Sequence, residues 1–289
     1  MRSHRFLPAL AAVTLLACET QSTRPSAPPP PGPTVSPVAP EARASTPAAA
    51  SSSAAAPIAE ATSTALVDTC PAGMVGITGG SYTTPARRDL VTVTPFCMDR
   101  TEVAVDAYAA CVKAGKCSDA HVDGWTSDGA SFVAEDNCNY GKPGRARQPM
   151  NCVDWKQATA FCAAQGARLP TEEEWEWVAR GGARGSRYPW GDAVPDAQVC
   201  WSLKGQPQRR ATCAVGTSAA DASPLGVLDL AGSVSEWTAT PYNDEHARVV
   251  RGATFTSQFE YHGRASTRGG VSPVAHSVAT GFRCTVGRR

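Results

Sequence analysis

The sequence has almost no excess of charge of either sign, since 27 Lys and Arg face 26 Asp and Glu, for a net charge of +1. A protein that binds nucleic acid over a broad surface needs a strong positive excess, so this class is excluded. Long helical bundles and coiled coils are excluded as well, because the chain holds 25 Gly and 23 Pro. No two cysteines have the C-x2-C spacing, which argues against a zinc site.

The N-terminus carries the features of an export signal. Arg2 and Arg5 precede an apolar run of twelve residues, 6–17, which is too short for a bilayer span of about 20 residues but fits a signal peptide. The run ends L-L-A-C at Cys18 and resembles a bacterial lipobox, in which the cysteine is diacylated; ordinary signal cleavage is the alternative. We expect residues 1–17 to be a lipoprotein signal peptide and Cys18 to anchor the chain in a bacterial membrane.

A change of composition separates a tether from a folded domain. Residues 19–66 hold ten Pro, thirteen Ala and eight Ser, and no Cys, Trp, Tyr or Phe. Such a segment buries too little apolar surface to offset the entropy of ordering it, so 18–66 is expected to be a lipidated Cys and a disordered linker. All seven Trp and the remaining ten Cys follow, so 67–289 is expected to be one folded domain.

Three segments of this domain have a helical pattern. Apolar residues recur at helical spacing in 105–114 and 154–165, and each segment is followed by a glycine. A third helix is expected from Thr171, because Thr171 and Glu174 form a capping-box pattern; its Trp175 is expected to be core and its Trp177 partly exposed. Short strands and long loops make up the rest, which indicates an α+β fold with little regular secondary structure.

Six ordered motifs then resemble one family. They are F-C-M-D-R-T-E-V at 96–103, a segment at 151–182 that contains R-L-P-T-E-E-E-W, Y-P-W-G-D at 188–192, L-G-V-L-D-L-A-G-S-V-S-E-W-T at 225–238, R-G-A-T-F at 251–255 and G-F-R-C at 281–284. Together they resemble the formylglycine-generating enzyme (sulfatase-modifying factor) family. The resemblance implies a single domain with a C-type-lectin-like core.

The resemblance also implies where the catalytic centre would be. Active members bind Cu(I) through two cysteines and oxidise a sulfatase cysteine to formylglycine. The matching positions are Ser257 and His262. A hydroxyl is a hard ligand that cannot replace a thiolate for Cu(I), and one imidazole is not enough. Copper binding is therefore not expected, and the residues favour a protein without catalytic activity over an oxidase.

Other metals are implied less directly. The family's calcium segment G-N-V-W-E-W corresponds to 232–237, where Glu236 and the Val234 carbonyl are retained but Ser233 replaces the Asn. Loss of one oxygen weakens a site for an ion that takes six or more ligands, and a structural hydrogen bond or ion pair of Glu236 is the alternative. The family's iron branch uses three His; an iron site here would need His262 and His276 with a carboxylate.

Three arginines, Arg264, Arg268 and Arg283, are candidates for lining the former substrate groove. The alternative is that they are surface arginines and that Arg283 belongs to a buried pair.

The ten cysteines of an exported domain favour up to five disulfides. Cys200 and Cys213 flank a polar loop and are expected to pair. The resemblance implies a bridge between Cys162 and Cys284, and the loss of another family bridge at Ala179 and Ala265. The pairing of six cysteines stays open: Cys70, Cys97, Cys111, Cys117, Cys138 and Cys152.

The function expected from these residues is a membrane-tethered, non-catalytic binding module of the bacterial cell envelope, at the outer membrane or the periplasmic face. Its partners would be the membrane, through the lipid, and an envelope protein or glycan, with no nucleic acid. An oxidoreductase of the formylglycine-generating or non-haem iron type, acting on proteins or small molecules, is the alternative. A purely structural envelope lipoprotein is a third hypothesis.

Overall fold

The computed structural model describes residues 69–121, 124–125, 132–133, 137–193, 199–205 and 207–288. The expected signal peptide, Cys18 and the linker lie outside these residues. Residues 63–289 form one unit of the chain. None of the helices in the described ranges has the length and apolar character needed to cross a membrane.

Three short helices form where the sequence places them. They are α1 (Val105–Lys113), α2 (Trp155–Ala164) and α3 (Glu172–Ala179). Asp154 and Thr171 begin α2 and α3, and each closes a reciprocal capping box with the residue three positions later. The three helical predictions are confirmed.

Strands of two to eight residues complete the fold. The three-stranded antiparallel sheet has the order β1 (Met74–Ile77), β4 (Phe96–Asp99), β11 (Thr285–Gly287). The four-stranded sheet has the order β10 (Thr280–Gly281), β7 (Ser235–Tyr242), β8 (Asp244–Arg251), β9 (Arg268–Val271). Two hairpins, β2 (Gly80–Thr83) with β3 (Leu90–Val93) and β5 (Gly124–Trp125) with β6 (Phe132–Val133), and the single turns η2 (Gly182–Arg184), η3 (Ala219–Asp221) and η4 (Glu260–Gly263) complete the described elements.

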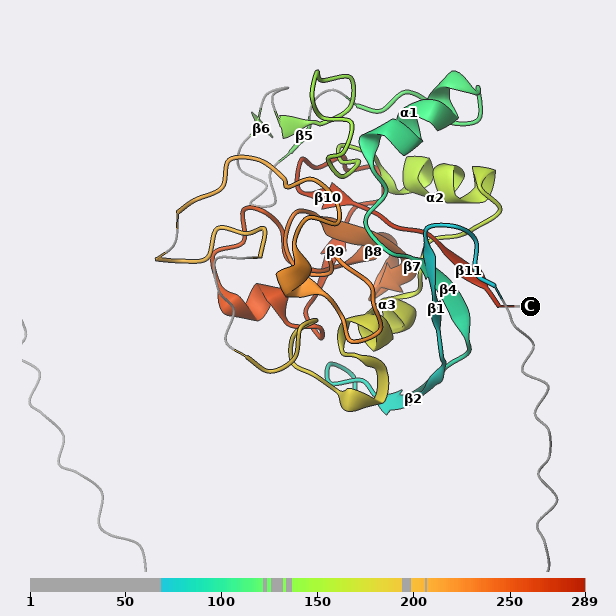
Figure 1. The fold of residues 1–289 in the computed structure, drawn as a ribbon, viewed down its shortest axis with the longest axis vertical. Coiled ribbons are helices and arrows are strands. Elements are labelled where there is room, and N and C mark those ends of the chain that lie inside the picture. The colour runs from blue at the N-terminus through green and yellow to red at the C-terminus, as the bar shows by residue number, and fades with distance from the viewer. Residues whose placement is uncertain are drawn as a thin grey trace, which may run out of the picture. The chain divides into compact units, whose positions relative to one another are not determined.

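The helices lie on different sides of the four-stranded sheet. Figure 1 shows α1 and α2 side by side at one end of the domain, and α3 against β7 and β8. Much of the chain between these elements is loop, so the expected α+β fold with little regular secondary structure is confirmed. The long loops are held in place by disulfide bonds and by backbone hydrogen bonds.

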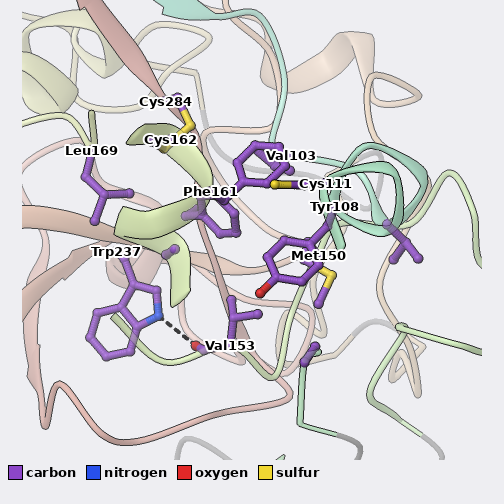
Figure 2. Packing of buried hydrophobic residues seen from close by; sticks show 14 of the residues in the cluster. Val103, Tyr108, Cys111, Met150, Val153, Phe161, Cys162, Leu169, Trp237 and Cys284 are labelled. Atoms are coloured by element: carbon purple, nitrogen blue, oxygen red, sulfur yellow. Dashed lines mark hydrogen bonds between the residues drawn. A yellow bond between two sulfur atoms is a disulfide. The ribbon is translucent and has the colours of Figure 1, made fainter. Parts of the chain in front are cut away.

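The main apolar core lies between α1, α2 and the segment 282–284, which precedes β11. Figure 2 shows Phe161 beside Tyr108, with ring centroids 5.6 Å apart, and the disulfide of Cys162 and Cys284 nearby. Trp237 is fully buried, and its Nε1 donates to the Val153 carbonyl over 3.0 Å. A buried indole with a satisfied N–H fixes β7 against the segment before α2.

Trp177 departs from the expectation of partial exposure, because only 4% of it is exposed. Its Nε1 donates to the Thr78 carbonyl over 2.9 Å, and its ring lies 5.7 Å from that of Tyr82. The hairpin of β2 covers the face of α3 opposite Trp175. The prediction was wrong because helical spacing shows only that the two tryptophans lie on different faces of the helix. It does not show whether other elements cover both faces.

All ten cysteines of the domain are paired in disulfides. The two predicted bridges, Cys162–Cys284 and Cys200–Cys213, are confirmed. The six open positions pair as Cys70–Cys97, Cys111–Cys117 and Cys138–Cys152.

Candidate functional site

The loop that carries Ser257 and His262 follows β8 and is closed by one buried arginine. Arg251 ends β8 and is 1% exposed. Its Nη1 donates to the carbonyls of Ser266 and Thr267, over 3.1 and 3.0 Å, and its Nη2 pairs with the Glu176 carboxylate of α3. The start and the end of the loop are therefore held together against α3.

Ser257 is turned into this loop and not toward solvent. It is 8% exposed, and its Oγ accepts the backbone N–H of Thr254 over 3.0 Å. Its carbonyl accepts the N–H of Ser202 over 3.0 Å, close to the Cys200–Cys213 bridge. The hydroxyl at the family's first cysteine position thus stabilises a turn.

His262 lies in η4 among aromatic rings. Its ring contacts Tyr261 edge to face, with centroids 4.3 Å apart, and its Nδ1 is buried without a hydrogen-bond partner among the described residues. Burial lowers the pKa of the imidazole, which favours the neutral form. Phe259 and Tyr261 stack on one another and are 45% and 48% exposed. The family's catalytic positions therefore lie at an aromatic surface, beside a histidine whose pKa is lowered.

The donor set at these positions does not fit Cu(I). The soft ligands that this ion prefers are thiolates, and all ten cysteines of the domain are held in disulfides. Ser257 offers a hydroxyl that already accepts the Thr254 N–H.

The residues of the expected calcium site are engaged by other protein groups. Glu236 is fully buried, and its two oxygens accept Nε and Nη2 of Arg283 over 2.7 Å each. One of them also accepts Nε1 of Trp175 over 2.9 Å. The Ser233 hydroxyl is bonded to the backbone of Cys213. The donor set as placed does not fit calcium and favours the alternative of a buried ion pair; calcium binding stays a prediction.

The positive charge of Arg283 also lies near other carboxyl groups in the interior. Its Nη1 and Nη2 donate to three backbone carbonyls, those of Asp99, Leu228 and Asp229. Asp99 accepts the N–H of Cys284 over 2.8 Å. Burial raises the pKa of Asp99 to about 6.

Three more carboxyl groups, those of Glu102, Asp221 and Asp229, lie in the same region, and burial is the largest influence on the pKa of each. Glu102 accepts the Val234 N–H over 3.2 Å, while its Oε2 is buried without a partner in the described part of the chain. Burial, followed by the charge of Asp229, raises the pKa of Glu102 well above its usual value and that of Asp221 to about 7. Burial also raises the pKa of Asp229. Four carboxyl groups with raised pKa values thus lie in one region of the domain, and no motif in the sequence marks this region.

The groove candidates Arg264 and Arg268 differ in their contacts. Arg268 donates to both oxygens of Glu172, over 2.8 and 3.1 Å, and lies over the Tyr242 ring. Arg264 is 43% exposed and reaches Glu260 over 3.8 Å. Arg268 thus has a structural role, whereas Arg264 is available beside the aromatic surface.

His262 and His276, the residues of the possible iron site, have different ring neighbours. His276 stacks on His121 with ring centroids 3.9 Å apart. The described residues contain no group of three or more His, Cys, Asp or Glu that could hold a metal ion. An iron site at His262 and His276 stays a prediction.

Ala179 and Ala265, the positions of the missing family bridge, are buried in the same apolar cluster. Two small side chains in one cluster agree with the joint loss of both cysteines. The exposed Phe259 and Tyr261 were missed by the sequence analysis, although an F-x-Y pattern in a loop with no helical or strand period is a signal for them.

Comparison with known proteins gives concordant similarities. A family model described as "Sulfatase-modifying factor enzyme 1-like domain" matches residues 60–287. The "Inactive C-alpha-formylglycine-generating enzyme 2" of Bos taurus is 40% identical over 151 residues, which cover 48% of this chain and 50% of that protein. The "Formylglycine-generating enzyme" of Thermomonospora curvata is 27% identical over 282 residues, which cover 73% of this chain and 92% of that protein.

The chain spans about half the length of the mammalian relatives it matches. The crystal structure of CarF superposes with a TM-score of 0.60 and 22% identity, covering 75% of this chain and 98% of that one. At this identity the likeness shows the fold alone. Together with the short helices and strands and the five disulfides, it confirms the expected disulfide-stapled α+β fold of this family.

Proposed function

Because the chain belongs to the family of sulfatase-modifying factor enzyme 1-like domains, we propose that it is a non-catalytic member whose loop 252–264 serves as a binding surface. The observation that carries this is the fate of the two cysteine positions. Ser257 caps a turn and His262 lies under two exposed aromatic rings, so neither supplies a thiolate. A mammalian relative is itself described as inactive, which agrees with loss of activity within this family.

The aromatic surface supports a binding role. Phe259, Tyr261 and Arg264 are of the residue types that dominate protein interfaces. They lie on a loop that Arg251 fixes at both ends. Because the loop is already ordered, binding would cost little conformational entropy.

The tether belongs to the same proposal. A lipidated Cys18 followed by the proline- and alanine-rich segment 19–66 would hold the domain at the bacterial cell envelope. An envelope protein or glycan would then be the partner. Mass spectrometry of the full chain from membranes should find a diacylglycerol adduct on Cys18, and an unmodified thiol there would remove the tether from the proposal.

The test of catalysis is direct. The purified domain is incubated with Cu(I), O2 and a C-x-P-x-R peptide, and the peptide is analysed for the aldehyde by mass spectrometry. We expect no formylglycine and no stoichiometric copper by elemental analysis. Formation of formylglycine at a catalytic rate, or stoichiometric copper or iron in the pure protein, would favour the oxidoreductase alternative.

The binding surface is tested with a double variant, Phe259→Ser with Tyr261→Ser. Cross-linking in membranes should yield a partner for the parent chain that is lost in the double variant. Leu90→Ser is the matched control, because Leu90 is 76% exposed and lies on β3, outside the loop. Loss of the partner in the control alone, or in neither variant, would contradict a role for this surface.

A further inference from the structure

A small hollow lies where the turn after α3 meets the end of loop 252–264. Its volume is about 100 Å³, close to the space of three liquid water molecules. The hydrogen-bonding side chains around it come from the segments 176–187 and 265–266. They are Glu176, Arg180, Ser186, Arg187 and Ser266.

Arg180 lines this hollow, and some of its N–H groups have no hydrogen-bond partner among the described residues. It is the C-cap residue of α3, and its side chain is 15% exposed. Its Nη1 makes only long contacts, 3.4 Å to the Thr83 carbonyl and 3.5 Å to Glu176, and its planar group lies 4.8 Å from the Tyr82 ring centroid. Its Nε is buried and has no partner among the described residues. The guanidinium is therefore held in place with part of its donor set unused.

The other donors are equally uncommitted. Within the ranges that the structure describes, the side chains of Ser186, Arg187 and Ser266 take no part in a hydrogen bond or ion pair. The backbone of Arg187 is nevertheless fixed, because its N–H donates to Asp192 over 2.7 Å and its carbonyl accepts the N–H of Ala265 over 2.8 Å. The donors thus extend from a rigid frame.

The charge around the hollow is positive. Glu176 supplies the one carboxylate, and it is paired with the buried Arg251. Arg180 has only the long 3.5 Å contact with Glu176, and the side chain of Arg187 forms no ion pair with the described residues. Two arginines and two hydroxyls around a space of this size match a tetrahedral oxyanion, because guanidinium groups bind phosphate-type oxygens through paired N–H donors.

We propose that the hollow between Arg180, Ser186, Arg187 and Ser266 is a binding site for a phosphate or sulfate group. The group would be a free ion or the terminal ester of a larger ligand, and the chemistry of recognition is the same for both. The proposal does not depend on whether loop 252–264 is a binding surface or whether the protein is an enzyme.

The experiment is a calorimetric titration of the full chain with sodium phosphate and sodium sulfate at constant ionic strength. Saturable binding is expected, and Arg187→Gln should weaken it about tenfold, the loss of one charge-assisted hydrogen-bonding group. Ser186→Ala should weaken it less. Arg187 is exposed and free of side-chain partners in the described chain, so its variant is expected to fold.

Arg184→Gln is the matched control, since Arg184 is an exposed arginine in η2 whose side chain does not line the hollow. Its affinity should stay within about twofold of the parent. No saturable binding, or an equal loss in the Arg184 and Arg187 variants, would overturn the proposal. A parallel titration with glycerol phosphate distinguishes the sources: tighter binding assigns an ester, and binding of the inorganic ions alone assigns a free ion.

Discussion

At the scale of single residues, the contacts decide between roles that the residue type leaves open. A carboxylate at position 236 can be a metal ligand or one half of an ion pair. Both of its oxygens accept from Arg283, and one also accepts from Trp175. The sequence could name Glu236 as important, but it could not identify its partner, because Arg283 lies 47 residues further along the chain.

The buried pair predicts a large effect for a small change. Glu236→Gln keeps the shape and an acceptor for Trp175 but leaves Arg283 without its carboxylate, so the free energy of unfolding should fall by about 3–5 kcal/mol. Glu260→Gln is the control: Glu260 is exposed and 3.8 Å from Arg264, and its loss should cost less than about 1 kcal/mol. Urea unfolding of both variants gives the comparison.

A second measurement, of the melting temperature, distinguishes the ion pair from a calcium site. EGTA should leave the melting temperature of the parent chain unchanged if Glu236 serves Arg283 alone. A lower melting temperature in EGTA, restored by added calcium, would instead support a calcium ion at Ser233, Val234 and Glu236. Equal stability of the parent and Glu236→Gln would contradict the structural role.

At the scale of elements, the predictable parts were those with local signals. The capping boxes of α2 and α3 are four-residue patterns, and both helices begin where these patterns place them. Strands such as β10, two residues long and paired with β7 about 45 residues away, have no such signal. The Ser257 and His262 positions could be found by motif. The residues around the hollow of about 100 Å³ could not, because no motif joins Arg180, Arg187 and Ser266.

The disulfides of this fold close loops of very different length, which predicts different contributions to stability. Cys162–Cys284 closes 122 residues and Cys111–Cys117 closes six. In the chain-entropy model, removing the long bridge should cost about 5 kcal/mol and removing the short one about 2 kcal/mol. The paired variants are Cys162→Ala with Cys284→Ala, and Cys111→Ala with Cys117→Ala. Guanidinium unfolding should rank them in this order, and equal losses would show that loop span is not what sets the stability.

At the scale of the whole molecule, a near-neutral chain conceals an uneven interior. The net charge is +1, yet four carboxyl groups lie around the buried guanidinium of Arg283, which is already paired with Glu236. They are those of Asp99, Glu102, Asp221 and Asp229. Four further negative charges in this interior would be costly, so the folded state retains protons that the unfolded chain would release. Composition averages over the chain and cannot reveal this arrangement.

The consequence is a stability that falls as the pH rises. Burial holds the folded-state pKa of Asp99 at about 6 and that of Asp221 at about 7, against about 3.9 in an unfolded chain. Below pH 4 both states are protonated and the groups have no effect. Between pH 4 and its folded-state pKa, about 6 for Asp99 and about 7 for Asp221, each group ionises in the unfolded state alone and costs about 1.4 kcal/mol of stability per pH unit. Thermal unfolding should therefore show a higher melting temperature at pH 5 than at pH 8.

Asp221→Asn isolates one contribution to this slope. The amide keeps the Oδ1 acceptor that receives the Asp229 N–H over 3.1 Å and cannot ionise. The variant should match the parent near pH 4 and exceed its stability at pH 8, where the parent carries the cost of the buried carboxyl. Asp106→Asn, at an exposed position in the first turn of α1, should leave the pH profile unchanged. A profile of Asp221→Asn parallel to that of the parent would show that Asp221 ionises in the folded domain as freely as in the unfolded chain.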